Sequence, residues 1–314
     1  ELLSLLRDRL SINLKKIERP DIEDVMKSVL EVNPVLLRGK PMVLAEEQKE
    51  AVFQAINSPL SIVTGGPGTG KTSVALTILR VHKILGLAER PALVAPTGRA
   101  ANRLSESLTN GLNSIKHLGK LKDDAELLKF AADAKTLHRL LGYYPDKHSF
   151  SHHEYDPLEH DLLIIDEGSM IDQELMIHLL RASKSKLPYL LPVQRIIIMG
   201  DPKQLPSVGN GSILMDLTGV AVQKGIDSYE NPVSILKLEK NYRQNISDTA
   251  GRNILGIAAL VNEMDINPDP DLLFESESLD SEVLVRLESL EEAGLENVMF
   301  PHQVNNTKSL KDFG

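Results

Sequence analysis

A glycine-rich loop is the stretch of this sequence best suited to chemistry. An apolar run over residues 60–63 predicts a buried strand before the loop, and residues 74–79 have helical spacing after it. This order of strand, glycine turn and helix is the context that a phosphate-binding loop requires, although a plain turn before an ordinary helix is the alternative. We therefore expect a nucleotide to bind at Gly65, Gly66, Pro67, Gly68, Thr69, Gly70, Lys71 and Thr72.

The residue types in this loop match the parts of a bound nucleoside triphosphate. Glycines leave backbone N–H groups free to converge on a phosphate, and the positive end of the following helix favours the same anion. Lys71 would reach the β- and γ-phosphates, and Thr72 would offer its hydroxyl to Mg²⁺. The loop by itself does not indicate what the nucleotide is used for.

Two carboxylates follow a second apolar segment. Residues 161–165 are almost continuously apolar, which suits a strand of a parallel sheet with helices on both faces. Asp166, at the end of that strand, can hold Mg²⁺ through water, and Glu167 can orient and polarise an attacking water. Two acids after a strand are a weak signal alone, but downstream of a phosphate-binding loop they predict a hydrolytic site.

Two further apolar runs end in polar segments. Residues 195–199 predict a strand that leads into a loop carrying Gln204, and a glutamine beside the phosphate-binding loop can sense a γ-phosphate. A plain turn is the alternative for that loop. Residues 235–238 predict another strand, and Arg243 beyond it could serve as a γ-phosphate cation in the manner of an arginine finger.

Polar residues elsewhere could contact adenine or DNA. Gln48 lies on a predicted helix before the loop, where its amide could read an adenine edge, and a surface glutamine is the alternative. The predicted strand 92–95 ends in a turn with Pro96, Thr97 and Arg99, at the edge where open α/β sheets bind ligands. Thr97 and Arg99 could hold a phosphodiester backbone, or the turn could simply begin a helix with a solvated arginine.

A short helix is predicted over residues 136–142, after a polar insertion. Thr136 would cap its start and Gly142 would end it. The helix carries His138, and a lone histidine in such a place is more often structural than functional.

Composition limits the class of protein. With 314 residues, 42% of them hydrophobic, the chain should hold one large domain with a smaller piece, or two domains. No apolar run approaches the length of a membrane span and no signal peptide opens the sequence, so we expect a cytoplasmic protein without membrane contact. The absence of cysteine excludes disulfides and thiolate metal sites and favours a reducing compartment.

The net charge of −9 originates in one segment. Residues 263–296 contain twelve acidic residues and one basic residue, whereas the rest of the chain has 34 basic and 32 acidic residues. The segment predicts a solvated acidic insertion more than an interaction tail. The overall acidity therefore does not exclude a surface that binds nucleic acid.

Six motifs, taken in order over roughly residues 44–261, resemble those of superfamily 1 DNA helicases of the RecD kind. They are Gly-Gly-Pro-Gly-Thr-Gly-Lys-Thr, Ala-Pro-Thr-Gly-Arg-Ala-Ala-Asn-Arg-Leu, Thr-Leu-His-Arg-Leu-Leu-Gly, Ile-Asp-Glu-Gly-Ser-Met-Ile-Asp, Gly-Asp-Pro-Lys-Gln-Leu-Pro-Ser-Val-Gly and Asn-Tyr-Arg-Gln. The stretch around His152, His153, Pro157 and Leu158 resembles the RecD subunit of the RecBCD exodeoxyribonuclease V complex more than the stand-alone RecD-like helicases.

The resemblance implies a fold and an activity. The fold would be a RecA-like, three-layer α/β sandwich of the P-loop NTPase class, with a parallel central sheet. The activity would be ATP hydrolysis with Mg²⁺, coupled to 5′-to-3′ movement on single-stranded DNA in recombinational repair. The partners implied are RecB-like and RecC-like subunits.

The resemblance also implies roles for individual residues. The ATP site would contain Gln48, the loop from Gly65 to Thr72, Asp166, Glu167, Gln204 and Arg243. The DNA path would contain Pro96, Thr97, Arg99 and His138. Gly168 departs from the family, which commonly has alanine after Asp-Glu.

We expect three parts along the chain. Residues 1–40 would be the remnant of a helical N-terminal domain, 41–262 a RecA-like motor domain 1A, and 263–314 an acidic extension. Superfamily 1 motors close ATP between two such domains, and no motif of a second one follows Arg243. Because the sequence also begins at Glu1 rather than Met, we expect a fragment that folds but does not translocate by itself.

Two other functions fit parts of the pattern. A P-loop phosphotransferase or switch NTPase that does not act on DNA would explain the loop and Asp166, but not the Gln204 loop or Asn-Tyr-Arg-Gln. An assembly scaffold, with motor activity residing in its partners, is the third possibility.

Overall fold

The computed structural model describes residues 1–37, 39–115, 122–187, 192–204, 209, 211–224, 233–240 and 242. The chain divides into two compact units, Glu1–Lys240 and Asn241–Gly314, and every described residue except Tyr242 belongs to the first. The boundaries of the three parts expected from the sequence stay predictions.

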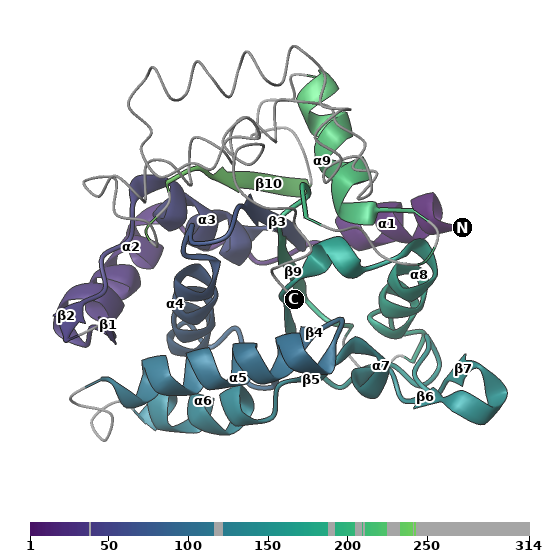
Figure 1. The fold of residues 1–314 in the computed structure, drawn as a ribbon, viewed down its shortest axis with the longest axis horizontal. Coiled ribbons are helices and arrows are strands. Elements are labelled where there is room, and N and C mark those ends of the chain that lie inside the picture. The colour runs from purple at the N-terminus through teal and green to yellow at the C-terminus, as the bar shows by residue number, and fades with distance from the viewer. Residues whose placement is uncertain are drawn as a thin grey trace, which may run out of the picture. The chain divides into compact units, whose positions relative to one another are not determined.

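A parallel sheet of six strands forms the centre of the first unit (Figure 1). Its strand order is β10-β3-β9-β8-β4-β5, and each neighbouring pair runs parallel. The five apolar runs predicted as strands are confirmed, whereas β5 is too short for a pattern to indicate. The strands are β3 (Leu60–Gly65), β4 (Pro91–Ala95), β5 (Lys135–Thr136), β8 (Leu162–Ile165), β9 (Arg195–Gly200) and β10 (Val233–Leu238).

Helices cover both faces of this sheet, because successive strand residues point to opposite sides. Val63 and Ile164 belong to a buried core on one face, whereas Ile62 and Ile165 belong to the core on the other. The first core is closed by α3 (Glu46–Asn57), α4 (Lys71–Ile84), α5 (Gly98–Asn113) and α6 (Lys122–Ala132). The second is closed by α1 (Leu2–Leu10), α7 (Leu137–Leu140), α8 (Gln173–Ala182) and the start of α9 (Ile213–Lys224). The three-layer, RecA-like α/β fold expected from the sequence is therefore confirmed.

The polar insertion contains a helix that is anchored by a buried ion pair. Arg80 of α4 and Asp124 of α6 lie 2.7 Å apart, Nε to Oδ1, and both side chains are almost fully buried. The guanidinium of Arg80 also donates to the carbonyls of Val29 and Asn33. One side chain thus joins α4, α6 and the N-terminal segment, and an uncompensated charge here would be costly.

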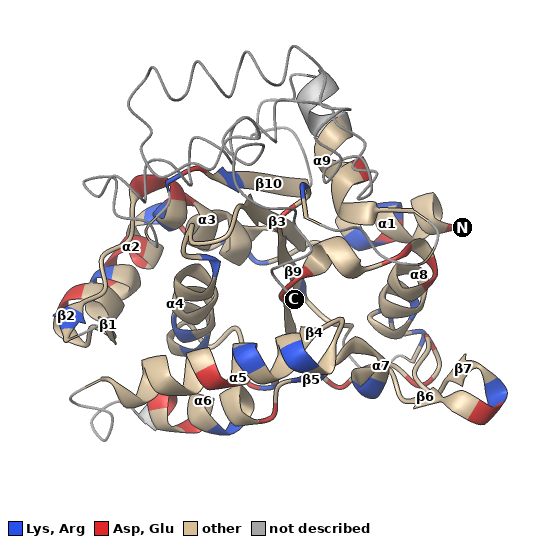
Figure 2. Ribbon diagram, viewed as in Figure 1, with Lys and Arg blue, Asp and Glu red and all other residues tan. Residues whose placement is uncertain are grey.

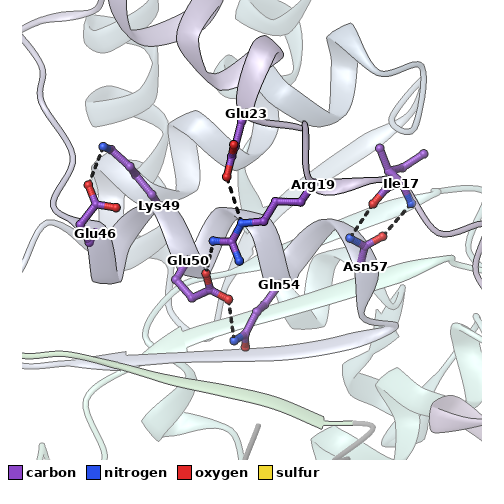
Figure 3. A network of polar contacts seen from close by, with 8 residues as sticks. All are labelled: Ile17, Arg19, Glu23, Glu46, Lys49, Glu50, Gln54 and Asn57. Atoms are coloured by element: carbon purple, nitrogen blue, oxygen red, sulfur yellow. Dashed lines mark hydrogen bonds and ion pairs between the residues drawn. The ribbon is translucent and has the colours of Figure 1, made fainter. Parts of the chain in front are cut away.

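The N-terminal segment packs onto the sheet and its helices. It contains α1, α2 (Arg19–Lys27), a π-helical turn η1 (Ser28–Val32), and a hairpin of β1 (Leu36–Leu37) and β2 (Lys40–Pro41). The predicted helices are confirmed, and the hairpin is not indicated by the sequence pattern. Figure 3 shows Arg19 between Glu23 and Glu50, so that α2 is tied to α3 by ion pairs at an exposed site.

The remaining elements are short. A hairpin of β6 (Tyr143–Tyr144) and β7 (Ser149–Phe150) encloses the 3-10 turn η2 (Pro145–Lys147), and a second turn, η3 (Gly168–Met170), follows the carboxylates. Among the described residues, no helix combines the length and the apolar character needed to cross a membrane.

Candidate functional site

The glycine-rich loop joins β3 to α4, as the sequence predicts. Gly68 and Gly70 have φ values of 86° and 84°, in the left-handed region that side chains disfavour, and Gly70 is the residue before the first turn of α4. A Cβ at Gly65 would lie 3.1 Å from Leu238 of β10. The loop is therefore held in a shape that only glycines allow, with its N–H groups at the start of a helix.

Lys71 lies over this loop. Its Nζ donates to the carbonyls of Gly65 at 2.6 Å and Gly66 at 3.2 Å. Thr69 stiffens the same turn, because its hydroxyl donates to the Gly66 carbonyl at 2.9 Å. The ammonium group is thus placed at the centre of the loop, where a phosphate would meet it.

Gln48 contacts the loop directly. Its Nε2 donates to the Thr69 carbonyl at 2.9 Å, and its Oε1 accepts from the backbone N–H of Ala45 at 2.9 Å. The side chain is 2% exposed, so the surface-glutamine alternative is wrong. No sequence signal indicates the bond to Thr69, and the contact with adenine stays a prediction.

The two carboxylates lie at the end of β8, two strands from the loop. Asp166 Oδ1 accepts from the N–H of Glu167 at 2.9 Å. Burial raises the pKa of Asp166 above its ordinary value, while that hydrogen bond lowers it, the charge of Glu167 raises it and that of Lys71 lowers it. Glu167 has a φ of 55°, a strained conformation for a side chain other than glycine and one that clusters at functional sites.

Two glycines bring the carboxylate segment against β9. A Cβ at Gly168 would collide with the side chain of Ile198 and lie 3.2 Å from the Met199 carbonyl. A Cβ at Gly200 would lie 3.1 Å from the backbone nitrogens of Gly168 and Ser169. The departure from alanine at Gly168 therefore has a physical reason in this chain, because Ile198 occupies the space that a methyl group would need.

The loop after β9 lies beside the phosphate-binding loop. Asp201 is buried, and its Oδ2 is 3.9 Å from the position that a Cβ of Gly66 would take. Asp201 also accepts from the backbone of Lys203 through Oδ1 and from that of Gln204 through its carbonyl. Gln204 is therefore held close to the nucleotide loop, and Asp201 is a site residue that the sequence reasoning missed.

The predicted DNA contacts lie at the same edge of the sheet, beyond β4 and β5. Thr97 caps α5, because its hydroxyl accepts from the N–H of Ala100 at 3.2 Å, and Arg99 in the first turn is exposed. Figure 2 shows basic residues along α5. His138 of α7 is exposed, with its ring centre 5.2 Å from that of Tyr143. These positions are accessible, and their contact with DNA stays a prediction, as does that of the half-buried Pro96.

Arg243 lies outside the described residues, as does the stretch 205–208 of the Gln204 loop. Within the described part of the chain, no group of three or more His, Asp or Glu residues is placed to bind a metal ion. Thr72 and Asp166 nevertheless fit a Mg²⁺ ion, which commonly takes one or two protein oxygens and completes its shell with phosphate and water.

Comparison with known proteins agrees with this geometry. The profile of the AAA domain family matches residues 48–210, from the glutamine on α3 to the loop after β9. The chain belongs to the AAA domain family. Because the matched residues contain the phosphate-binding loop and the carboxylates, this AAA domain binds a nucleotide together with a metal ion.

Relatives of this AAA domain include subunits of RecBCD enzymes. It is 40% identical over 178 residues to the RecBCD enzyme subunit RecD of Haemophilus influenzae, covering 56% of this chain and 26% of that protein. It is 37% identical over 187 residues to the RecD subunit of Mycolicibacterium smegmatis, covering 58% and 31%. The resemblance to RecD drawn from the motifs is thus confirmed.

A protein named as a DNA helicase is also similar. The ATP-dependent RecD2 DNA helicase of Deinococcus radiodurans is 36% identical over 178 residues, covering 57% of this chain and 20% of that protein. The chain spans less than a third of the length of each of these three relatives.

Proposed function

We propose that this AAA domain is part of an ATP-dependent DNA helicase that moves 5′ to 3′ on single-stranded DNA during recombinational repair. The observation that carries the proposal is the convergence of three loops at one edge of the sheet. The phosphate-binding loop, the Asp166–Glu167 pair and the Gln204 loop follow β3, β8 and β9, and β9 lies between the other two strands. A site at this edge is where open α/β sheets bind ligands.

The geometry supports a separate role for each of the site residues. Lys71 neutralises the β- and γ-phosphates of ATP. Thr72 and Asp166 would hold Mg²⁺, which would supply positive charge against the phosphate oxygens. Glu167 orients the attacking water and accepts its proton. Gln204 senses the γ-phosphate, and its loop passes the nucleotide state to the DNA path at Thr97, Arg99 and His138. Arg243 acts as a γ-phosphate cation in the same scheme.

The first test measures ATP hydrolysis by the full-length protein with and without single-stranded DNA. We expect the rate to rise several-fold with DNA, and DNA affinity to fall steeply between about 50 and 200 mM salt, because phosphate contacts release counterions. Equal rates with and without DNA would overturn the proposal and favour a switch NTPase that does not act on DNA.

The direction of movement and the partners need their own measurements. A duplex with a 5′ single-stranded tail should be unwound, and one with a 3′ tail should not. We further propose that the full-length protein assembles with RecB-like and RecC-like subunits in the cytoplasm, as in the complexes for which its RecD relatives are named. Co-purification of both subunits with the tagged protein from its native cells tests the assembly.

A further inference from the structure

Asp172 connects the carboxylate segment to the far end of the Gln204 loop. It lies six residues after Asp166, at the residue before α8, and its Oδ1 accepts from the N–H of Leu175 at 2.7 Å. This is an N-cap bond, which fixes the orientation of the whole carboxylate. The sequence and the proposed mechanism assign Asp172 no part in the reaction.

The other side of this carboxylate is covered by Gly209. A Cβ placed on Gly209 would lie 2.8 Å from both Cβ and Cγ of Asp172, and its nearest neighbour would be Oδ2. Real Cβ atoms are not found that close to other heavy atoms, so the backbone of Gly209 rests directly on the Asp172 side chain. The next described residue, Gly211, passes within ordinary contact distance of Gln173.

The Gln204 loop is therefore held at both ends by the segment that bears the carboxylates. At its near end, the backbone of Gly200 lies against Gly168 and Ser169, with no room for a side chain. At its far end, Gly209 lies against Asp172. Two segments that are packed this closely cannot be displaced independently. A displacement of the carboxylate segment must therefore displace the Gln204 loop, and the reverse.

We propose that Asp172 is a positioning residue that seats the Gln204 loop on the carboxylate segment. Its carboxylate has two separate tasks: Oδ1 caps α8, and the side chain as a whole supports Gly209. The proposal rests on the helicase function proposed above, in which Gln204 couples the γ-phosphate to DNA. Loss of the seat lowers the DNA-stimulated turnover of ATP without changing the nucleotide-binding loop.

The capping task and the seating task can be separated by substitution. Serine caps helices about as well as aspartate, so Asp172→Ser keeps α8 capped while it shortens the side chain beneath Gly209. Gly209→Ala does the reverse, because it leaves Asp172 intact and drives a methyl group into it. The exposed helical Gly219, whose Cβ position has no neighbour within 4 Å, provides the matched control Gly219→Ala.

The experiment measures kcat and KM for ATP with saturating single-stranded DNA in the full-length protein and its four variants, namely the three single substitutions and the double variant D172S/G209A. We expect G209A to lower kcat about tenfold, as contacting residues couple on this scale, with KM unchanged. D172S lowers kcat with its unfolding midpoint unchanged. In the D172S background G209A lowers kcat by a smaller factor than in the unmodified protein, because serine lacks Oδ2, the atom that would lie nearest to the methyl group.

Each outcome decides between the proposal and its alternatives. An equal loss from G209A in both backgrounds, or full activity of D172S, would overturn the seating role. A fall in kcat that is matched by a fall in the unfolding midpoint of D172S would mean that capping alone matters, which also overturns it. If DNA does not stimulate ATP hydrolysis by the unmodified protein, the proposed helicase function is wrong. The unmodified protein alone gives this result, so it is distinguished from a failure of the seating role, which only the variants reveal.

Discussion

Lys71 is the residue on which the nucleotide site depends most directly. Its Nζ donates to two carbonyls of the loop. Burial raises the pKa of Asp166 across the site, and the charge of Lys71 offsets part of that rise. The charge of Lys71 therefore acts on both the phosphate-binding loop and the carboxylate segment. Replacing it removes the loop's one long cationic side chain and leaves the glycine backbone as it was.

Lys71→Ala should abolish nucleotide binding or hydrolysis while the fold stays intact. Loss of a charge that stabilises the transition state lowers turnover by about two orders of magnitude or more. The side chain is half-buried and makes no ion pair with any residue that the structure describes, so the free energy of unfolding in urea should change by less than about 0.5 kcal/mol. Lys49→Ala, at a partly exposed position on α3, is the control, and normal ATP hydrolysis in the Lys71 variant would show that the loop assignment is wrong.

At the scale of elements, α1 is fastened to the sheet by a buried arginine. Arg9 donates to the Pro59 carbonyl through Nε at 3.0 Å and Nη2 at 2.6 Å, and to the Val193 carbonyl through Nη1. Pro59 precedes β3 and Val193 precedes β9, so one side chain ties the starts of two adjacent strands. Burial and the nearby Arg195 lower the pKa of Arg9 to about 9, and it stays charged at neutral pH.

Arg9→Met should destabilise the unit strongly, whereas Arg7→Met should not. Methionine keeps much of the packing but leaves the buried Val193 carbonyl without its arginine donor and the Pro59 carbonyl with the N–H of Ile196, at a cost of about 2–3 kcal/mol. Arg7 lies on the exposed side of the same helix, which makes it a matched control. Urea denaturation measures both, and equal free energies of unfolding for the two variants would contradict the role given to Arg9.

At the scale of the whole molecule, a buried histidine makes stability depend on pH. His82 of α4 is fully buried, and burial, with the nearby charge of Arg195, lowers its pKa to about 3. Above pH 6.5 the imidazole is neutral in both the folded and the unfolded chain. Below that pH the unfolded chain binds a proton that the folded chain cannot accept, so the free energy of unfolding falls as the pH falls.

His82→Leu should remove this part of the acid sensitivity. One proton taken up on unfolding corresponds to a slope of about 1.4 kcal/mol per pH unit. Between pH 6.5 and 5, the free energy of unfolding of the variant should therefore gain about 1–2 kcal/mol relative to the unmodified protein. Urea denaturation across this range measures the difference. The exposed His138→Leu controls for removal of an imidazole, and parallel curves for His82→Leu would refute the assignment.

Much of the fold and of the candidate site could be predicted from the sequence, because local sequence patterns specify the conformation of these segments. Apolar runs bounded by turns locate five strands of the sheet, and a glycine loop between strand and helix specifies its own conformation. The predicted cap Thr136 likewise acts on its own helix, where its hydroxyl accepts from the N–H of Arg139. Local patterns could not predict the two-residue strands or the helix α6 within the polar insertion. Packing determines the short strands, and the buried Arg80–Asp124 pair anchors α6.

The sequence by itself therefore determined the chemistry: a phosphate loop, two carboxylates at a strand end and a glutamine loop beyond the next strand. Only the tertiary structure decided how these parts are held together. Gln48 supports the loop at Thr69, Arg9 joins two strand starts, and Gly209 rests on Asp172. Each of these contacts joins residues far apart in the chain, and no local spacing can specify a contact whose geometry depends on the packing of the whole sheet.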